Sequence, residues 1–180
     1  MFDYFIGKKP NIAKITITFL VSVYFFRYLQ NPETWGIIDS FNLLMHEAGH
    51  WIFAIFGETI GILGGSLTQI FIPIIFIVYF FLFQMQMFSA SILLFWLSQN
   101  ILNVARYVGD AVTMQLPLIG GENVIHDWNF LFVKFGLLHN TTTIANGMKL
   151  VGVIIFICAV FFSFKYSFNE TENEGIIENV

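Results

Sequence analysis

The sequence predicts an all-α bundle of membrane-spanning helices, and two observations lead to this fold class. Hydrophobic residues make up 57% of the 180-residue chain, whereas charged residues make up only 11% and the mean hydropathy is +0.74. Soluble domains carry about 25% charged residues, so this chain cannot cover a water-facing surface. In addition, its apolar residues form separate runs of the roughly 20 residues that one helical span requires.

Five apolar runs are candidate spans, at residues 12–29, 37–57, 68–86, 88–115 and 144–165. The first run follows a basic start, as in a signal peptide, but bulky YFFRYLQ stands where small residues would mark a cleavage site, so we expect a retained span. The weakly polar FQMQM separates the third and fourth runs and predicts a tight helical hairpin. Residues 129–138 are apolar but too short to cross a bilayer, which favours an interfacial or re-entrant helix.

Between the second and third runs, the segment ETIGILGGSLTQ contains glycines at 61, 64 and 65 and is a poor helix former. Irregular backbone at membrane depth survives only where it is buried or lines a wet cavity. The sequence therefore predicts a re-entrant segment or a short hairpin, which would pair with an extended peptide by β-augmentation through Gly64, Gly65 and Ser66. A simple connecting loop is the alternative.

We expect one transmembrane domain over residues 1–165 and a disordered, acidic tail over residues 166–180. The net charge of -4 comes largely from this tail, and the sequence has no basic patch that would bind nucleic acid. Cys158 is the single cysteine, which excludes an intramolecular disulfide and a thiolate zinc cluster.

The lysine and arginine residues predict the orientation in the membrane. With five spans, one side would carry six basic residues and the other side two. The larger set is Lys8, Lys9, Lys14, Arg106, Lys134 and Lys149, and the smaller set is Arg27 and Lys165. This bias favours a cytoplasmic N-terminus and an exterior tail, in a cell (inner) membrane.

A histidine, a glutamate and a second histidine stand within the second apolar run, in LLMHEAGHWIFAIFG. Ionisable groups at the bilayer centre cost about 2.5–3.5 kcal/mol each at the low end of estimates, so each requires a compensating partner. On a helix, His46 and His50 project from one face and can share one ion. Glu47 lies beside them, where a carboxylate can take a proton from water that Zn²⁺ has acidified. The alternative is that HEAGH occurs by chance, or that its histidines only form hydrogen bonds inside the bundle.

A polar stripe on the fourth run offers the third protein ligand that such a zinc site requires. Gln99, Asn103, Arg106 and Asp110 are spaced by four, three and four residues and therefore share one helical face. We expect Asp110 to be the third ligand, and Asn103 to bind a substrate carbonyl or to stabilise the oxyanion formed during hydrolysis. The alternative for Asp110 is an ion pair with Arg106.

The loop GGENVIHDW contains a rival for the third ligand, His126. Its neighbour Asp127 is interpreted as a cap of the helix that starts at Trp128. Glu122 is a weaker candidate from the same loop, and His139 is interpreted as structural.

HEAGH within a hydrophobic helix, a glycine-rich stretch after it and a later aspartate on another span together resemble the site-2 protease family, over roughly residues 37–115. The resemblance implies an intramembrane zinc metalloprotease in which His46 and His50 bind zinc and Glu47 is the catalytic base. The family's second motif has prolines and Asp-Gly, whereas NVARYVGDA has no proline and has an alanine in place of the glycine. The chain is similar to the minimal, divergent members that lack a PDZ domain.

The sequence therefore predicts a membrane zinc metalloendopeptidase with Zn²⁺ as cofactor, a transmembrane segment of another protein as substrate, and the lipid bilayer as surroundings. Two other classes would use the same residues. One is a catalytically degenerate scaffold that binds transmembrane helices, and the other is a metal or ion transporter with a polar pathway of Asp110, Arg106 and the histidines. A haem protein is disfavoured, because His46 and His50 on one face cannot bracket a porphyrin.

Overall fold

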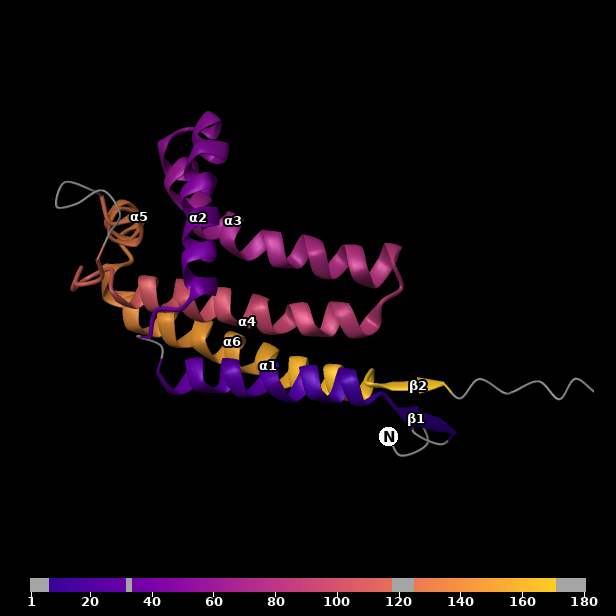
Figure 1. The fold of residues 1–180 in the computed structure, drawn as a ribbon. Coiled ribbons are helices and arrows are strands. Elements are labelled where there is room, and N and C mark those ends of the chain that lie inside the picture. Colours follow the sequence, from indigo (N-terminus) through magenta and orange to yellow (C-terminus); the bar gives the residue numbers. More distant parts are fainter. Residues whose placement is uncertain (1–6, 32–33, 118–124, 171–180) are drawn as a thin grey trace, which may run out of the picture.

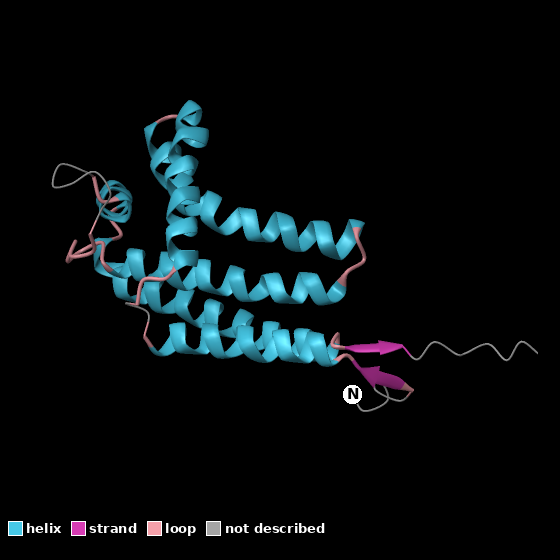
Figure 2. Cartoon of the chain, in the orientation of Figure 1, coloured by secondary structure: helices cyan, strands magenta, loops and turns pink. Residues whose placement is uncertain are grey.

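The computed structural model describes residues 7–31, 34–117 and 125–170, and this part of the chain is almost entirely helical (Figure 2). Its α-helices are α1 (Ile12–Gln30), α2 (Ile37–Phe53), α3 (Glu58–Val78), α4 (Met87–Gly109), α5 (Asp127–Phe135) and α6 (Thr141–Lys165). The shorter elements are the 3₁₀ turns η2 (Ala54–Phe56) and η4 (Leu138–Asn140), the π-helical turn η3 (Tyr79–Phe83), and the strands β1 (Lys8–Pro10) and β2 (Phe168–Glu170). The predicted all-α fold class is confirmed.

The helices run in two directions (Figure 1). The helices α1, α4 and α6 and the second half of α3 lie alongside one another, whereas α2 stands across them with the first half of α3 at its side. Pro73 lies inside α3 and cannot donate a hydrogen bond to the carbonyl of Gln69, which permits the change of direction. Residues 37–69 therefore form a helical hairpin, here called the α2–α3 hairpin, that projects from the side of the bundle.

Four helical segments of the described chain are long and apolar enough to cross a membrane, Ile12–Gln30, Glu58–Phe83, Met87–Gly109 and Leu138–Lys165. They are compatible with a multi-pass membrane protein. The structure thus has four such segments where the sequence predicted about five. The difference is α2, which has 17 residues and lies across the other helices. The predicted hairpin between the third and fourth runs is present as η3 followed by α4, and α5 has only 9 residues, as expected for a segment too short to cross.

The helix α4 lies at the centre of the bundle and holds two groups of buried apolar side chains. One group joins α4 to α5 and α6 through Val104, Val108, Ala111, Phe132 and Ala145. The other joins α4 to α1 and α6 through Phe25, Phe95 and Ala159. Buried apolar contacts thereby hold both halves of α4 in place.

The glycine-rich segment of residues 58–69 is helical, so the predicted re-entrant strand or loop is wrong. Its glycines serve a close helix crossing. A Cβ on Gly64 would lie 2.7 Å from the carbonyl oxygen of Gly49, and a Cβ on Gly49 would lie 2.3 Å from that of Gly64. Small residues at a crossing let two membrane helices pack backbone to backbone. This packing outweighs the low helix propensity of glycine, about 1 kcal/mol per residue, on which the prediction relied.

Both described ends of the chain lie at the same end of the bundle, where β1 pairs with β2 in antiparallel register (Figure 1). The prediction of a tail on the side opposite to the N-terminus is therefore wrong, because α2 does not add a crossing.

Four basic residues lie at each end of the bundle. Lys8, Lys9, Lys14 and Lys165 are at the end with the strands, and Arg27, Arg106, Lys134 and Lys149 are nearer the other end. Lysine and arginine bias thus favours neither orientation. Most of the predicted tail, residues 171–180, lies outside the described residues.

Candidate metal centre

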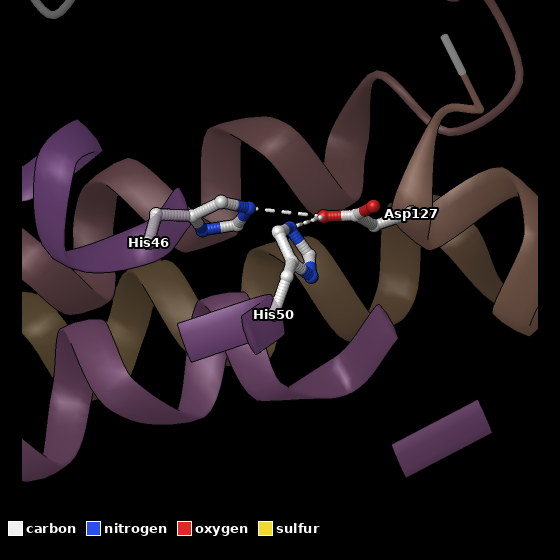
Figure 3. Close-up of side chains that lie close together, drawn as sticks. All are labelled: His46, His50 and Asp127. Carbon is white, nitrogen blue, oxygen red and sulfur yellow. Dashed lines mark hydrogen bonds and ion pairs between the residues drawn. The ribbon is translucent and has the colours of Figure 1, made fainter. Parts of the chain in front are cut away.

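Two histidines of α2 and one aspartate of α5 converge on one point (Figure 3). The Oδ2 atom of Asp127 lies 2.9 Å from Nε2 of His46 and 3.3 Å from Nε2 of His50. The donor atoms of the three residues all lie within 4.8 Å of one another. Nitrogen and oxygen ligands 2.0–2.2 Å from one tetrahedral ion are separated by roughly 3.3–3.6 Å. The group therefore has the size and the donor types of a metal site, without being specific to zinc.

The second nitrogen of each imidazole contacts an acceptor, which supports the same interpretation. Nδ1 of His50 lies 2.9 Å from the carbonyl oxygen of Gly61, and Nδ1 of His46 lies 3.3 Å from Oε1 of Gln69. An acceptor at Nδ1 favours the ring form with a proton on Nδ1 and a lone pair on Nε2. Histidines that ligate metals are held by their outer nitrogen in this way. When an ion replaces the protons that the two Nε2 atoms donate to Asp127, both lone pairs would point to the same place as the Asp127 carboxylate.

Gly65 provides the room for this convergence. A Cβ at this position would lie 2.6 Å from Nε2 of His46 and 2.7 Å from Nε2 of His50. Any side chain on residue 65 would therefore occupy the space beside both ligand nitrogens. The spacing of glycines along α3 thus serves two purposes, since Gly64 contacts the α2 backbone and Gly65 leaves space for the imidazoles.

The charge of the centre suits a cation. Burial raises the pKa of the Asp127 carboxyl, but the hydrogen bonds from His46 and His50 outweigh this effect and hold the pKa below its usual range. Asp127 is therefore an anion at neutral pH. The hydrogen bond to Asp127 raises the pKa of His50 to about 9. A metal ion entering the site must displace the proton of His50, so metal binding should release protons.

A cavity of about 860 Å³ runs along the inner face of α2 and exposes the centre. His46, Glu47 and His50 line it from α2, and Asn103 and Asp127 line it from the opposite elements. This volume lies in the range of about 300–1,000 Å³ that is typical of ligand sites. Glu47 is half-buried, and its carboxylate forms no hydrogen bond with any other described residue, so this group is available to a molecule bound in the cavity.

Asp110, the predicted third ligand, is not brought to the histidine pair. Its Oδ1 accepts hydrogen bonds from the Thr113 hydroxyl at 2.6 Å and the Gln115 amide at 2.9 Å, and its Oδ2 accepts one from the Leu116 amide at 2.9 Å. Burial raises the pKa of Asp110, but these hydrogen bonds outweigh it and the net pKa is lowered. The carboxylate therefore caps the turn that follows α4. The helical stripe that contains Asp110 was predicted from spacing, but α4 ends at Gly109 and the stripe ends with it.

His126, the rival ligand, also lies apart from the pair. Its Nδ1 accepts a hydrogen bond from the Asn129 amide at 3.2 Å, and its Nε2 lies 3.3 Å from Oδ2 of Asp110. His126 is thus the N-cap of α5, the role that the sequence analysis gave to the next residue. This cap places Asp127 in the first turn of α5, and the Asp127 amide donates a hydrogen bond to the Tyr107 hydroxyl at 3.1 Å.

Asp127 is the candidate ligand that the sequence did not predict. The signal for it was weak, because an aspartate at the start of a helix is usually explained by capping. Only the position of α5 beside α2 distinguishes the two roles. Of the other candidates, Glu122 lies outside the described residues, and His139 lies in η4, apart from the cavity.

The predicted substrate-binding residues are part of the packing of the helices. Gly64 and Ser66 are buried, and Ser66 accepts a hydrogen bond at 3.1 Å from the indole of Trp128 on α5. Gly65 faces the imidazoles and not the cavity. The α3 residues that do line the cavity are Glu58, Gly61, Ile62 and Gln69, which lie two or more residues away along the helix. The described chain therefore offers no strand edge at residues 64–66 for β-augmentation.

Asn103 does line the cavity, as its predicted contact with substrate requires. Its Oδ1 accepts a hydrogen bond from Nε2 of Gln69 at 2.9 Å, which connects α4 to α3 beside His46.

Comparison with known proteins adds no further assignment: no protein-family model, no curated protein sequence and no solved structure matches this chain.

Proposed function

We propose that this chain is an intramembrane zinc metalloendopeptidase that hydrolyses peptide bonds in transmembrane segments of other proteins, as its HEAGH motif suggests by resemblance to the site-2 proteases. The observation that carries the proposal is the convergence of His46, His50 and Asp127 beside Glu47 on one cavity. His₂-carboxylate sets with an open fourth position are typical of hydrolytic zinc sites.

A zinc ion held by these three residues would supply Lewis acidity, lowering the pKa of water towards about 7 and polarising the substrate carbonyl. Glu47 then acts as general base and general acid. Its carboxylate takes a proton from the water as the water oxygen attacks the carbonyl carbon, and it returns that proton to the leaving nitrogen as the C–N bond breaks. The amide nitrogen of Asn103 is the group proposed to donate to the oxyanion, since Gln69 occupies its oxygen.

The surroundings of the cavity support a membrane-protein substrate. The segment Glu58–Phe83, which supplies one wall, is among those apolar enough to cross a membrane. The outer face of the α2–α3 hairpin also exposes large apolar side chains, including Trp51 and Ile55 at its tip. We propose the cell membrane as the location, with both described ends of the chain on one side of it.

Substitution of the base tests the proposal. Purified protein in liposomes should cleave members of a pool of synthetic single-span peptides, with products identified by mass spectrometry. Glu47→Gln should bind zinc as the wild type does but cleave roughly 10²–10⁴ times more slowly, because it cannot accept a proton. Gln84→Glu, the reverse exchange at an exposed residue outside the cavity, is the control and should retain cleavage.

The scaffold and the transporter make different predictions for the same experiment. A scaffold would bind the peptides without cutting them, and a transporter would carry zinc into the liposomes whether residue 47 is glutamate or glutamine. Zinc binding without cleavage by the wild type, or equal cleavage by Glu47→Gln, would contradict the enzymatic proposal.

A further inference from the structure

The two imidazoles of the candidate metal centre differ in the partner of Nδ1, the ring nitrogen that faces away from Asp127. His50 contacts a backbone carbonyl, that of Gly61, whereas His46 contacts a side chain, the amide oxygen of Gln69. Gln69 is only 2% exposed, so this contact is sheltered from water. A side-chain partner can point either its oxygen or its nitrogen at the ring, and only the oxygen favours the ring form that ligates a metal through Nε2.

Asn103 contacts the nitrogen end of the Gln69 amide and so favours the oxygen end facing His46. Nε2 of Gln69 donates to Oδ1 of Asn103 at 2.9 Å, and this leaves Oε1 for Nδ1 of His46 at 3.3 Å. If the Gln69 amide turned over, two oxygens would face each other at Asn103. The three side chains come from α2, α3 and α4, so these two hydrogen bonds also join the α2–α3 hairpin to the central helix α4.

We infer that Gln69 is a positioning residue of the metal centre: oriented by Asn103, it holds His46 with the proton on Nδ1 and so presents the Nε2 lone pair to a metal ion. This inference rests on the proposed function, because it assumes that the centre binds a metal. The competing explanation is structural. Gln69 precedes Pro73 by four residues, and a buried amide there would satisfy hydrogen bonds at the change of direction of α3 without affecting the metal.

Metal affinity in the absence of any substrate separates the two explanations. Zinc binding to the detergent-solubilised full chain is measured by competition with a chromophoric chelator. Gln69→Leu removes the acceptor, whereas Gln69→Glu keeps an acceptor oxygen for Nδ1 and offers its second oxygen to the Asn103 amide nitrogen once that amide turns over. Gln99→Leu is the matched control, because Gln99 is a second fully buried glutamine, which donates to Asp39 and contacts no residue of the centre. Size-exclusion chromatography and circular dichroism verify that each variant is folded.

Loss of such an outer partner typically weakens metal binding 10–100-fold. We expect a loss of this size in Gln69→Leu, an affinity nearer to wild type in Gln69→Glu, and none of this loss in Gln99→Leu. Asn103→Leu should also weaken binding, and the double variant Gln69→Leu/Asn103→Leu should bind no more weakly than Gln69→Leu alone, because the two residues act in series.

The outcomes distinguish this inference from the proposed function. If the wild-type chain binds no zinc, the metal centre and the role of Gln69 are both wrong. If the wild type binds zinc and Gln69→Leu binds it equally well, only the role of Gln69 is wrong. Equal losses in Gln69→Leu and Gln69→Glu, or full additivity in the double variant, would show a structural effect and would also overturn the inference.

Discussion

The described part of the chain contains two buried histidine–aspartate contacts that look alike in isolation. In the first, Oδ2 of Asp127 lies 2.9 Å from His46 and 3.3 Å from His50. In the second, Oδ2 of Asp110 lies 3.3 Å from His126. Both aspartates have the same exposed fraction, 8%. Distance and burial therefore do not separate a candidate metal centre from a structural contact.

The remaining hydrogen bonds of each carboxylate do separate them. Asp110 accepts from a hydroxyl and two backbone amides in addition to His126, so both of its oxygens are saturated by the turn that it caps. Within the described residues, the Asp127 side chain accepts only from the two imidazoles. A carboxylate whose partners are all potential ligands can exchange them for a cation, whereas one that holds backbone amides cannot do so without unfolding the turn.

The ring nitrogens show the same difference. His126 accepts a backbone amide at Nδ1 and so must carry its proton on Nε2, the nitrogen that faces Asp110. The rings of His46 and His50 contact acceptors at Nδ1, which leaves Nε2 for a metal. The contact between His126 and Asp110 is thus a hydrogen bond that fixes the start of α5. It thereby positions Asp127, the candidate ligand of the first contact.

Adding one methyl group beside the first contact should have the largest effect. In Gly65→Ala, the new Cβ would lie 2.6 Å from Nε2 of His46, whereas ordinary contact begins near 3.4 Å, so a ring must move by about 0.8 Å. Ligand sets tolerate displacements of only about 0.5 Å. We expect stoichiometric zinc binding, measured by elemental analysis of purified protein, to be lost.

The control for this prediction is Gly147→Ala on α6, where a Cβ would meet no atom within 4 Å. That variant should bind zinc like the wild type. Full zinc occupancy in a folded Gly65→Ala protein would place the ion away from the two Nε2 atoms and would remove the distinction between the two contacts.

The sequence supported the histidine pair, because two side chains four residues apart on a helix share a face whatever the tertiary structure is. The all-α class was equally accessible, since it follows from composition and run length. The third candidate ligand could not be predicted in this way. Asp110 was favoured by helical spacing, but α4 ends before it, and Asp127 reaches the site only because α5 packs beside the α2–α3 hairpin.

The prediction of a re-entrant segment or hairpin at the glycine-rich residues was wrong for a related reason. Propensity is a property of one residue, whereas the fit of Gly49 against Gly64 is a property of two helices. The direction of α2 could not be predicted from the sequence either. An apolar run at residues 37–57 is compatible with a helix that spans the membrane and with one that stands at an angle to the other helices. Contacts between distant segments therefore determined both the site and the number of crossings.

Exchanging each aspartate for asparagine should separate the two contacts in affinity. Asp127→Asn replaces an anionic ligand by a neutral amide, and zinc affinity should fall by more than the 10–100-fold typical of an outer partner. Asp110→Asn should change zinc affinity by less than tenfold but lower the free energy of unfolding by about 2 kcal/mol, because hydrogen bonds to a charged group are lost. Chelator competition and thermal unfolding of the metal-free protein measure the two quantities. The reverse assignment of effects would make Asp110 the ligand.

The acid dependence of that stability difference should be the smallest effect and the sharpest test of the second contact. The folded state lowers the pKa of Asp110 below its ordinary value of 3.8, so its charged form stabilises the fold. This contribution is complete above about pH 5, and it is lost as the pH falls through the lowered pKa of the folded state. The difference in melting temperature between wild type and Asp110→Asn, measured with chelator present, should therefore be constant from pH 7 to 5 and shrink as the pH falls below 4. A difference that persists unchanged to pH 2 would mean that the shape of the Asp110 side chain, and not its charge, holds the turn that leads towards Asp127.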